Sequence, residues 1–299
     1  MAIRSVAAVL EPEEILFENA KVSLCLLVNR HAKTLRIFDF RAGADPTKRG
    51  YVLSIAQREG VERVFTVVER DEVSVWIRLG FEREGTIPGF FKRSDAYVLG
   101  ASVPPALGAA PAGSGEVVID IQALAEGVLQ RAKRVAKDLG PPSPRTVRVQ
   151  PATDAIAKRA VATAARSGRA LTRFEGFGRD VERREFYATA RGGWSLVLSV
   201  ERQLCFDNAF VEVLVAPKTE RDIALTRVAL HHLCEQLSDE GTVACFAWTP
   251  IDDVGLAAAF LANGFRRTGI LPAHLVVRGR RAGAFLWTRK LTVPVDPDE

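Results

Sequence analysis

Long apolar runs and secretion signals are missing from this sequence. No stretch reaches the about 20 consecutive apolar residues that a membrane-spanning helix needs. The first 14 residues contain one arginine and a short apolar stretch that acidic residues soon follow, unlike a signal peptide. These absences predict a cytoplasmic protein with no membrane partner.

Cysteine is also scarce, and no two cysteines have the Cys-x-x-Cys spacing of a zinc or redox motif. Each lies in an apolar stretch, which predicts buried free thiols rather than disulfides or metal ligands. His231 and His232 adjoin Cys234, but no second cluster of ligands supports zinc, so no metal site is predicted. The cysteines are Cys25, Cys205, Cys234 and Cys245.

Positive charge is in slight excess, with a net charge of +5 and a pI of about 9.2. The basic residues are spread along the chain, and no Lys/Arg run is interleaved with aromatic residues, so a nucleic-acid partner is disfavoured. A mild positive field equally suits a phosphorylated cofactor. With 299 residues, the chain has the length of about two domains.

One phrase occurs twice, as WIRLGFEREGTIPGFF from Trp76 and as FLANGFRRTGILPAHL from Phe260. A constant spacing of 184 residues aligns identical residues without a gap, and each copy follows a strand candidate and a helical segment. The identities are Gly80/Gly264, Phe81/Phe265, Arg83/Arg267, Gly85/Gly269 and Pro88/Pro272. This repeat predicts tandem domains, in which the glycine of each Gly-Phe pair ends a helix with positive φ and the phenylalanine enters the core.

The composition divides the chain into three parts. Residues 1–100 form a truncated first domain, where about ten residues before KVSLCLLVN leave room for little more than two helical turns. Residues 101–144 begin with the linker composition ASVPPALGAAPAGSG and continue into an amphipathic connecting helix. Residues 145–295 form a complete second domain: a strand, a capped helix, a charged loop, three strands, a helix, a strand, a helix and a final strand pair.

This order of elements resembles the GNAT acyltransferase fold. NAFVEVLVAP, the helix from Thr219 and FLANGF carry the resemblance. It implies an α/β (α+β) fold of two tandem GNAT-like domains, each with a mixed, mostly antiparallel sheet flanked by helices. GFEREGTIPGFF followed by DAYVL resembles the N-terminal part of bacterial and archaeal β-lysine N-acetyltransferases, in which the C-terminal domain is expected to acetylate an amino group.

The resemblance implies an acetyl-CoA (coenzyme A) site in the second domain. Main-chain groups of residues 213–215 would pair with pantetheine, and a helix N-terminus, with its free N–H groups, would hold the phosphates. The family's Arg/Gln-x-x-Gly-x-Gly/Ala phrase is matched only at Ala224, and Asp222 replaces an inner glycine, so a decayed cofactor site stays an open alternative. The implied cofactor residues are Val213, Leu214, Val215, Lys218, Thr219, Glu220, Arg221, Asp222, Ile223, Ala224, Leu225 and Phe260.

Glu212 is the candidate general base, because GNAT enzymes often carry a glutamate on this strand. A carboxylate in an apolar strand is also costly unless it is satisfied, although a salt-bridged strand residue is the alternative. Many family members place a tyrosine before Gly-Phe as the general acid. Trp76 and Phe260 stand there instead, so solvent, Tyr187 or His274 would protonate the leaving thiolate.

Two functions follow from this sequence. The first is an acetyl-CoA-dependent N-acyltransferase that acetylates a small amine, an amino acid or a protein amine in its second domain. The first domain, where only Asp39 could be a base by strand position, would wall the acceptor site without catalysis. The alternative is a catalytically weak tandem GNAT-fold protein that binds CoA or another ligand. The sequence does not set the oligomeric state.

Overall fold

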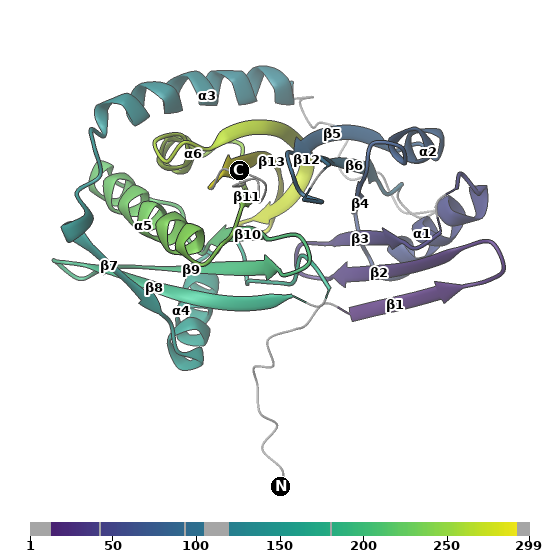
Figure 1. Cartoon of the computed structure of the whole chain (residues 1–299), viewed down its shortest axis with the longest axis horizontal. Coiled ribbons are helices and arrows are strands. Elements are labelled where there is room, and N and C mark those ends of the chain that lie inside the picture. Colours follow the sequence, from purple (N-terminus) through teal and green to yellow (C-terminus); the bar gives the residue numbers. More distant parts are fainter. Residues whose placement is uncertain (1–12, 42, 93, 105–119, 180, 292–299) are drawn as a thin grey trace, which may run out of the picture.

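The computed structural model describes residues 13–41, 43–92, 94–104, 120–179 and 181–291. Its first half contains antiparallel hairpins, a parallel strand pair and two helices (Figure 1). Its elements are β1 (Glu13–Glu18), β2 (Ser23–Asn29), β3 (Thr34–Asp39), α1 (Pro46–Arg58), β4 (Arg63–Val68), α2 (Val73–Arg78), β5 (Glu82–Ile87) and β6 (Ala96–Ser102).

The second half repeats this order behind an additional strand and helix. Its connecting helix α3 (Ile121–Asp138) and a 3₁₀ turn (Pro144–Thr146) come first. The other elements are β7 (Val147–Pro151), α4 (Asp154–Arg166), β8 (Glu182–Ala190), β9 (Trp194–Gln203), β10 (Asn208–Val213), α5 (Glu220–Asp239), β11 (Ala244–Pro250), α6 (Val254–Leu261), β12 (Arg266–Val277) and β13 (Arg280–Lys290).

All the strands of the described residues belong to one continuous sheet, in the order β1-β2-β3-β4-β6-β5-β12-β13-β11-β10-β9-β8-β7. Neighbours are antiparallel except β3–β4 and β10–β11, which are parallel. β5 and β12 meet in the middle, so the two halves join edge to edge. The predicted fold class, two units that each contain a mixed, mostly antiparallel sheet flanked by helices, is confirmed.

The repeated phrase builds the junction between the halves. In both β5 and β12 the register shifts at the same place, between Arg83 and Gly85 and between Arg267 and Gly269, as in a β-bulge. Gly85 then pairs with Gly269. A Cβ on Gly269 would lie 2.6 Å from the Gly85 Cα, and a Cβ on Gly85 would lie 3.2 Å from the Gly269 Cα. Both positions therefore need glycine because two backbones approach closely there.

The helix ends before these strands also match each other. Gly80 and Gly264 have φ values of 82° and 76°, as predicted for the end of a helix. Phe81 packs against Trp76 with 4.9 Å between ring centroids, and in the second half Phe265 lies 4.8 Å from its aromatic counterpart on α6. All four rings are buried, so the predicted core role of the Gly-Phe phenylalanines is confirmed.

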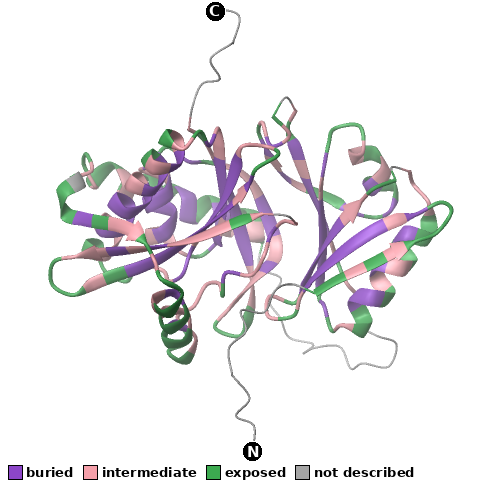
Figure 2. Cartoon of the chain, turned by 60° about the horizontal axis from the view of Figure 1, so that its bottom comes forward, coloured by how far each residue is buried: buried purple, intermediate pink, exposed green. Residues whose placement is uncertain are grey.

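Each half has its own large core, the two halves share another, and a smaller cluster lies at α4 in the second half. In the first half α1 and α2 cover one face of the sheet, and in the second half α3, α5 and α6 cover one face. Buried residues follow the central strands of both halves (Figure 2). Phe65 and Phe90 of the first half pack with Phe177, Phe210 and Phe246 of the second in an aromatic core that joins the halves.

Two expectations need correction. The residues before β2 form strand β1, paired antiparallel with β2, rather than helical turns, because the chain returns through a short turn at Asn19. Cys205 is exposed in the turn after β9, although the other cysteines are buried as predicted. The linker was predicted at 101–115, but β6 extends to Ser102 and so includes its first two residues. Residues 105–115 lie outside the described residues, and the predicted division into domains stays a prediction. Of the helices that the structure describes, none is long and apolar enough to span a membrane.

Candidate active site

The parallel strands β10 and β11 separate at one end. They pair from Asn208 and Ala244 as far as Val211 and Ala247. Beyond these residues β10 continues along β9 to Val213, and β11 continues along β13 to Pro250. A cleft therefore opens between the facing edges of the two strands.

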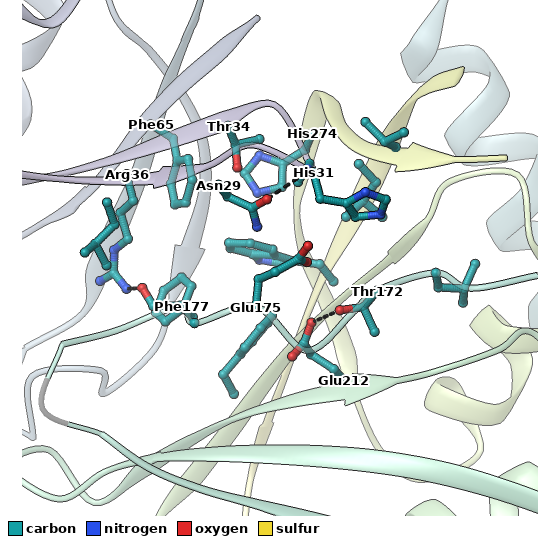
Figure 3. Close-up of a pocket in the computed structure, with 18 of the residues that line it drawn as sticks. Asn29, His31, Thr34, Arg36, Phe65, Thr172, Glu175, Phe177, Glu212 and His274 are labelled. Atoms are coloured by element: carbon teal, nitrogen blue, oxygen red, sulfur yellow. Dashed lines mark hydrogen bonds between the residues drawn. The ribbon is translucent and has the colours of Figure 1, made fainter. Parts of the chain in front are cut away.

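A cavity of about 80 Å³ lies at this cleft, and both halves of the chain line it. Figure 3 shows side chains of the β2–β3 hairpin opposite side chains of the second half. Glu212, Trp248 and His274 come from β10, β11 and β12. The first half contributes Asn29, His31, Thr34, Arg36 and Phe65.

Glu212 is half-buried and faces this cavity. The Thr172 hydroxyl donates a hydrogen bond to its carboxylate. Burial raises the pKa of Glu212 to about 8; the carboxylates of Glu175 and Glu201 add to the shift, while the Thr172 hydrogen bond and Arg183 oppose it. A carboxyl group with a pKa near the working pH can accept a proton from a bound ammonium group.

The connection between α4 and β8 forms the floor of the cavity and is firmly held. The buried carboxylate of Glu201 accepts hydrogen bonds from the Phe177 N–H (2.8 Å), the Gly178 N–H and Arg183 (2.6 Å). The Thr172 hydroxyl accepts a further bond from the Phe174 N–H (2.9 Å). These contacts position the segment that brings Thr172, and with it Glu175, to the cavity.

His274 contributes a neutral imidazole to the cavity wall. It is 1% exposed, and neither ring nitrogen has a hydrogen-bond partner among the described residues. Burial, reinforced by the positive charges of Arg63 and Arg281, holds its pKa well below the usual value. The ring packs edge-on against Trp248, 4.2 Å between centroids, and the Trp248 Nε1 also has no partner in the described chain.

The N-terminus of α5 is capped by side chains of its own first turn. Thr219 caps the helix, and Asp222 accepts hydrogen bonds from the N–H groups of Lys218 (3.2 Å) and Thr219 (3.1 Å). Arg221 donates to the main-chain oxygen of Arg191. The Asp222 carboxylate therefore engages the two N–H groups just before the helix, and the Thr219 hydroxyl accepts from the Asp222 N–H. Glu220 is exposed beside them.

The other implied cofactor residues are mostly packed in the protein. The main chain of Leu214 is occupied, since its N–H donates to Val197 and its oxygen accepts from Leu171. Phe260 is fully buried, 5.9 Å between centroids from Trp287, and does not line the cavity. Val213 reaches the cavity wall, whereas Val215, Ile223, Ala224 and Leu225 lie wholly or partly buried around the α5 side of the sheet.

Two other candidates lie away from this cavity. Asp39 forms an ion pair with Lys48, and both side chains are almost fully buried, so Asp39 is not free to act as a base. Tyr187 lies against α4, beside Leu214 in a different depression of the surface. Of the acids considered, only His274 lies in the cavity.

The first-half side chains in the cavity were not foreseen individually. Asn29, His31 and Arg36 belong to a hairpin about 180 residues before Glu212 in the sequence, with no motif spacing to connect them. Thr172 and Glu175 lay in a stretch that composition marks only as a charged loop. The first domain was expected to form a wall of the acceptor site, but only the structure identifies the residues of that wall.

No protein-family model matches the sequence, and no curated protein matches it. Solved structures of N-acetyltransferases resemble about half of the chain. The ribosomal-protein-S18-alanine N-acetyltransferase of Escherichia coli has a TM-score of 0.40 and 16% identity, covering 50% of this chain and 97% of that one. The spermidine N-acetyltransferase of Vibrio cholerae, solved with CoA and spermine, has a TM-score of 0.40 and 10% identity, covering 49% and 96%.

Proposed function

We propose that this protein is an acetyl-CoA-dependent N-acyltransferase that acetylates a small amine in the cleft between β10 and β11. The proposal depends chiefly on Glu212, a half-buried carboxyl group with a raised pKa that faces a cavity between both halves. The GNAT resemblance of the sequence supplies the reaction class. A tandem arrangement with a non-catalytic first half is part of this proposal, and the narrower resemblance to β-lysine N-acetyltransferases stays a prediction.

The reaction transfers an acetyl group from sulfur to nitrogen. The acceptor enters as an ammonium ion, and Glu212 removes one proton to expose the nitrogen lone pair. The amine attacks the thioester carbonyl and a C–N bond forms; as the C–S bond breaks, the nitrogen loses its second proton to solvent, and the leaving thiolate takes up a proton. His274, neutral and held by its aromatic neighbours, orients the acceptor by hydrogen bonding, and solvent protonates the thiolate, whose usual pKa is near 8.5.

The candidate site fits the thioester end of acetyl-CoA differently from the phosphate end. The separated edges of β10 and β11 offer unpaired main chain to a thioester arm. At the phosphate end, Asp222 places a carboxylate on the N–H groups at the start of α5. Lys218 and Arg221 are exposed there and would attract the phosphates.

Thiol release from acetyl-CoA, measured with a panel of small amines, tests the proposal. We expect release with wild-type protein and a loss of at least 100-fold in Glu212→Gln, because base catalysis typically contributes about 10²–10⁴-fold. Glu235→Gln, an exposed carboxylate on α5, is the matched control and should keep the wild-type rate. Release that survives Glu212→Gln removes Glu212 as the base.

A second function is favoured by two observations. The Asp222 carboxylate at α5 and the buried aromatic residues Trp76 and Phe260, where a tyrosine is common in the family, suit a tandem GNAT-fold protein that binds a ligand without turnover. Binding of acetyl-CoA without thiol release for any amine would support it. No binding of any acyl-CoA would exclude the acyltransferase and any role that depends on CoA binding.

A further inference from the structure

The first half has a second and larger cavity in the place that matches the first. β3 and β4 pair from Thr34 and Arg63 to Ile37 and Thr66, then continue without pairing, as β10 and β11 do. A cavity of about 490 Å³ lies there, within the range of about 300–1,000 Å³ typical of ligand pockets. The β9–β10 turn lines it, as the β2–β3 turn lines the first cavity.

The second cavity lacks the groups that make the first one reactive. The shared registers and the 184-residue repeat place Phe38 at the position of Glu212 and Phe90 at that of His274. Val67 stands where the second half has Trp248. The wall is therefore apolar and aromatic where the other cavity is polar, which suits binding without catalysis.

The carboxylate of Glu72 faces this cavity. It is half-buried, and the carboxylates of Asp39, Asp71 and Glu69 lie near it. Burial and these neighbours raise the pKa of Glu72. An ammonium group bound beside Glu72 would stabilise its ionised form and so offset both the burial of the carboxylate and the repulsion from its acidic neighbours.

Two cations of the described chain near this cavity have acidic partners. Lys48 pairs with Asp39, and Arg179 contacts Glu14 and lies over the Phe40 ring.

Buried donors lie in the same cavity wall. Arg36 is 6% exposed and Gln203 is 8% exposed, and both line the cavity. The Arg36 Nε and the Gln203 Nε2 have no hydrogen-bond partner among the described residues. Leaving a buried donor unsatisfied costs about 1–3 kcal/mol, more when it is charged, so these groups favour an anionic oxygen ligand.

We propose that this cavity is a second, non-catalytic binding site for a small zwitterion with an ammonium group, a carboxylate and an aromatic or bulky apolar group. Glu72 binds the ammonium group, and Arg36 with Gln203 binds the carboxylate. Phe90, Phe91 and Phe206 surround the apolar part; their rings pack 4.9–5.7 Å apart between centroids. Arg36 also lines the first cavity, so an occupant of the second site contacts a residue of the proposed active site.

Calorimetric titration of the full chain with three matched compounds tests this ligand class. L-Phenylalanine carries all three groups, 2-phenylethylamine lacks the carboxylate, and 3-phenylpropionate lacks the amine. We expect phenylalanine to bind at least tenfold more tightly than either of the others. No binding of phenylalanine at millimolar concentration, or equal affinity for all three, overturns the proposal.

Two variants locate the bound phenylalanine. Glu72→Gln, a half-exposed position, should weaken its binding at least tenfold, whereas Glu212→Gln in the first cavity should leave its affinity unchanged. The reverse pattern would place the ligand in the first cavity and overturn the second site. The titration uses neither acetyl-CoA nor turnover, so its result is independent of the proposed acyltransferase activity.

Discussion

The two parallel strand pairs of this protein separate in the same way, yet their clefts are filled differently. In the second half Glu212 follows the last paired residue of β10 and faces a cavity. In the first half Phe38 holds that position, and the next residue, Asp39, is tied to Lys48. Lys48 lies at the third position of α1, as Asp222 does in α5.

This difference indicates how a repeated fold can divide its roles. The backbone that creates a cleft is kept in both halves, including the bulge before Gly85 and Gly269. The side chains at the cleft then decide between a structural ion pair and a reactive carboxyl group. The two kinds of cleft predict different responses to substitution.

The largest expected effect comes from the ion pair of the first half. Lys48→Met would leave the Asp39 carboxylate buried without its partner, which typically costs about 3–5 kcal/mol. We expect the melting temperature to fall by about 10 °C. Thermal unfolding followed by circular dichroism measures this change.

The exposed pair of Lys158 and Asp154 provides the control. Its atoms are 3.9 Å apart, and Lys158→Met should change the melting temperature by less than about 2 °C. The double variant Lys48→Met/Asp39→Leu should recover much of the loss, since no buried charge remains. Equal, small effects of Lys48→Met and Lys158→Met would mean that the first cleft does not depend on its ion pair.

The next largest effect on stability is expected at the junction of the two halves. In Gly269→Ala the new Cβ would lie 2.6 Å from the Glu84 main-chain oxygen and the Gly85 Cα, which are backbone atoms with little freedom to move. We expect a loss of about 1–3 kcal/mol in the free energy of unfolding. Gly127→Ala, with no neighbour within 4 Å on α3, should be neutral or stabilising by up to about 1 kcal/mol. A Gly269→Ala protein as stable as wild type would contradict the close contact.

The glycine junction also marks how far the sequence could predict this structure. The repeat predicted two similar units and the helix ends at Gly80 and Gly264, because local backbone conformation demands glycine there. It did not predict that Gly85 and Gly269 face each other. Strand pairing between distant segments depends on tertiary packing, which no local pattern records.

The same distinction applies to the candidate site. Glu212 could be singled out because a carboxylate interrupts an apolar strand. The burial of Phe260 could not be predicted, because it depends on neighbours from other elements. The capping box of Thr219 and Asp222 at the start of α5 is instead a local pattern that the sequence itself carries. His31 and Arg36 reach Glu212's cavity only through the packing of one half against the other.

A smaller effect tests the charge state of Glu212. The pKa of Glu212 is about 8 in the folded protein, above the value of about 4.3 expected in the unfolded chain. Between these two pH values Glu212 is therefore protonated in the folded protein and ionised in the unfolded chain. The stability from the neutral carboxyl group is complete below about pH 4 and is lost as the pH rises through about 8. Glu212→Gln stays neutral, so its melting temperature relative to wild type should rise by about 2–4 °C between pH 6.5 and 7.5, where wild type loses about 1.4 kcal/mol.

The exposed carboxylate of Asp239 supplies the comparison for this pH series. Asp239→Asn should keep a constant difference from wild type over the same range. A constant difference for Glu212→Gln as well would show that the Glu212 carboxyl group is charged throughout, and the second cleft would then lose its distinguishing feature.

The smallest effect concerns the start of α5. Asp222→Asn keeps a capping oxygen but removes the charge, so the melting temperature without ligand should change by only about 1 °C. Loss of a repelling charge at a helix N-terminus is worth about 0.3–1 kcal/mol to an anion, which corresponds to a two- to fivefold tighter binding of acetyl-CoA. Asp239→Asn, at the far end of α5, should leave that affinity unchanged. If Asp222→Asn binds acetyl-CoA no better than wild type does, the phosphates do not bind at α5, and the second cleft must hold its substrate through β10 and β11 alone.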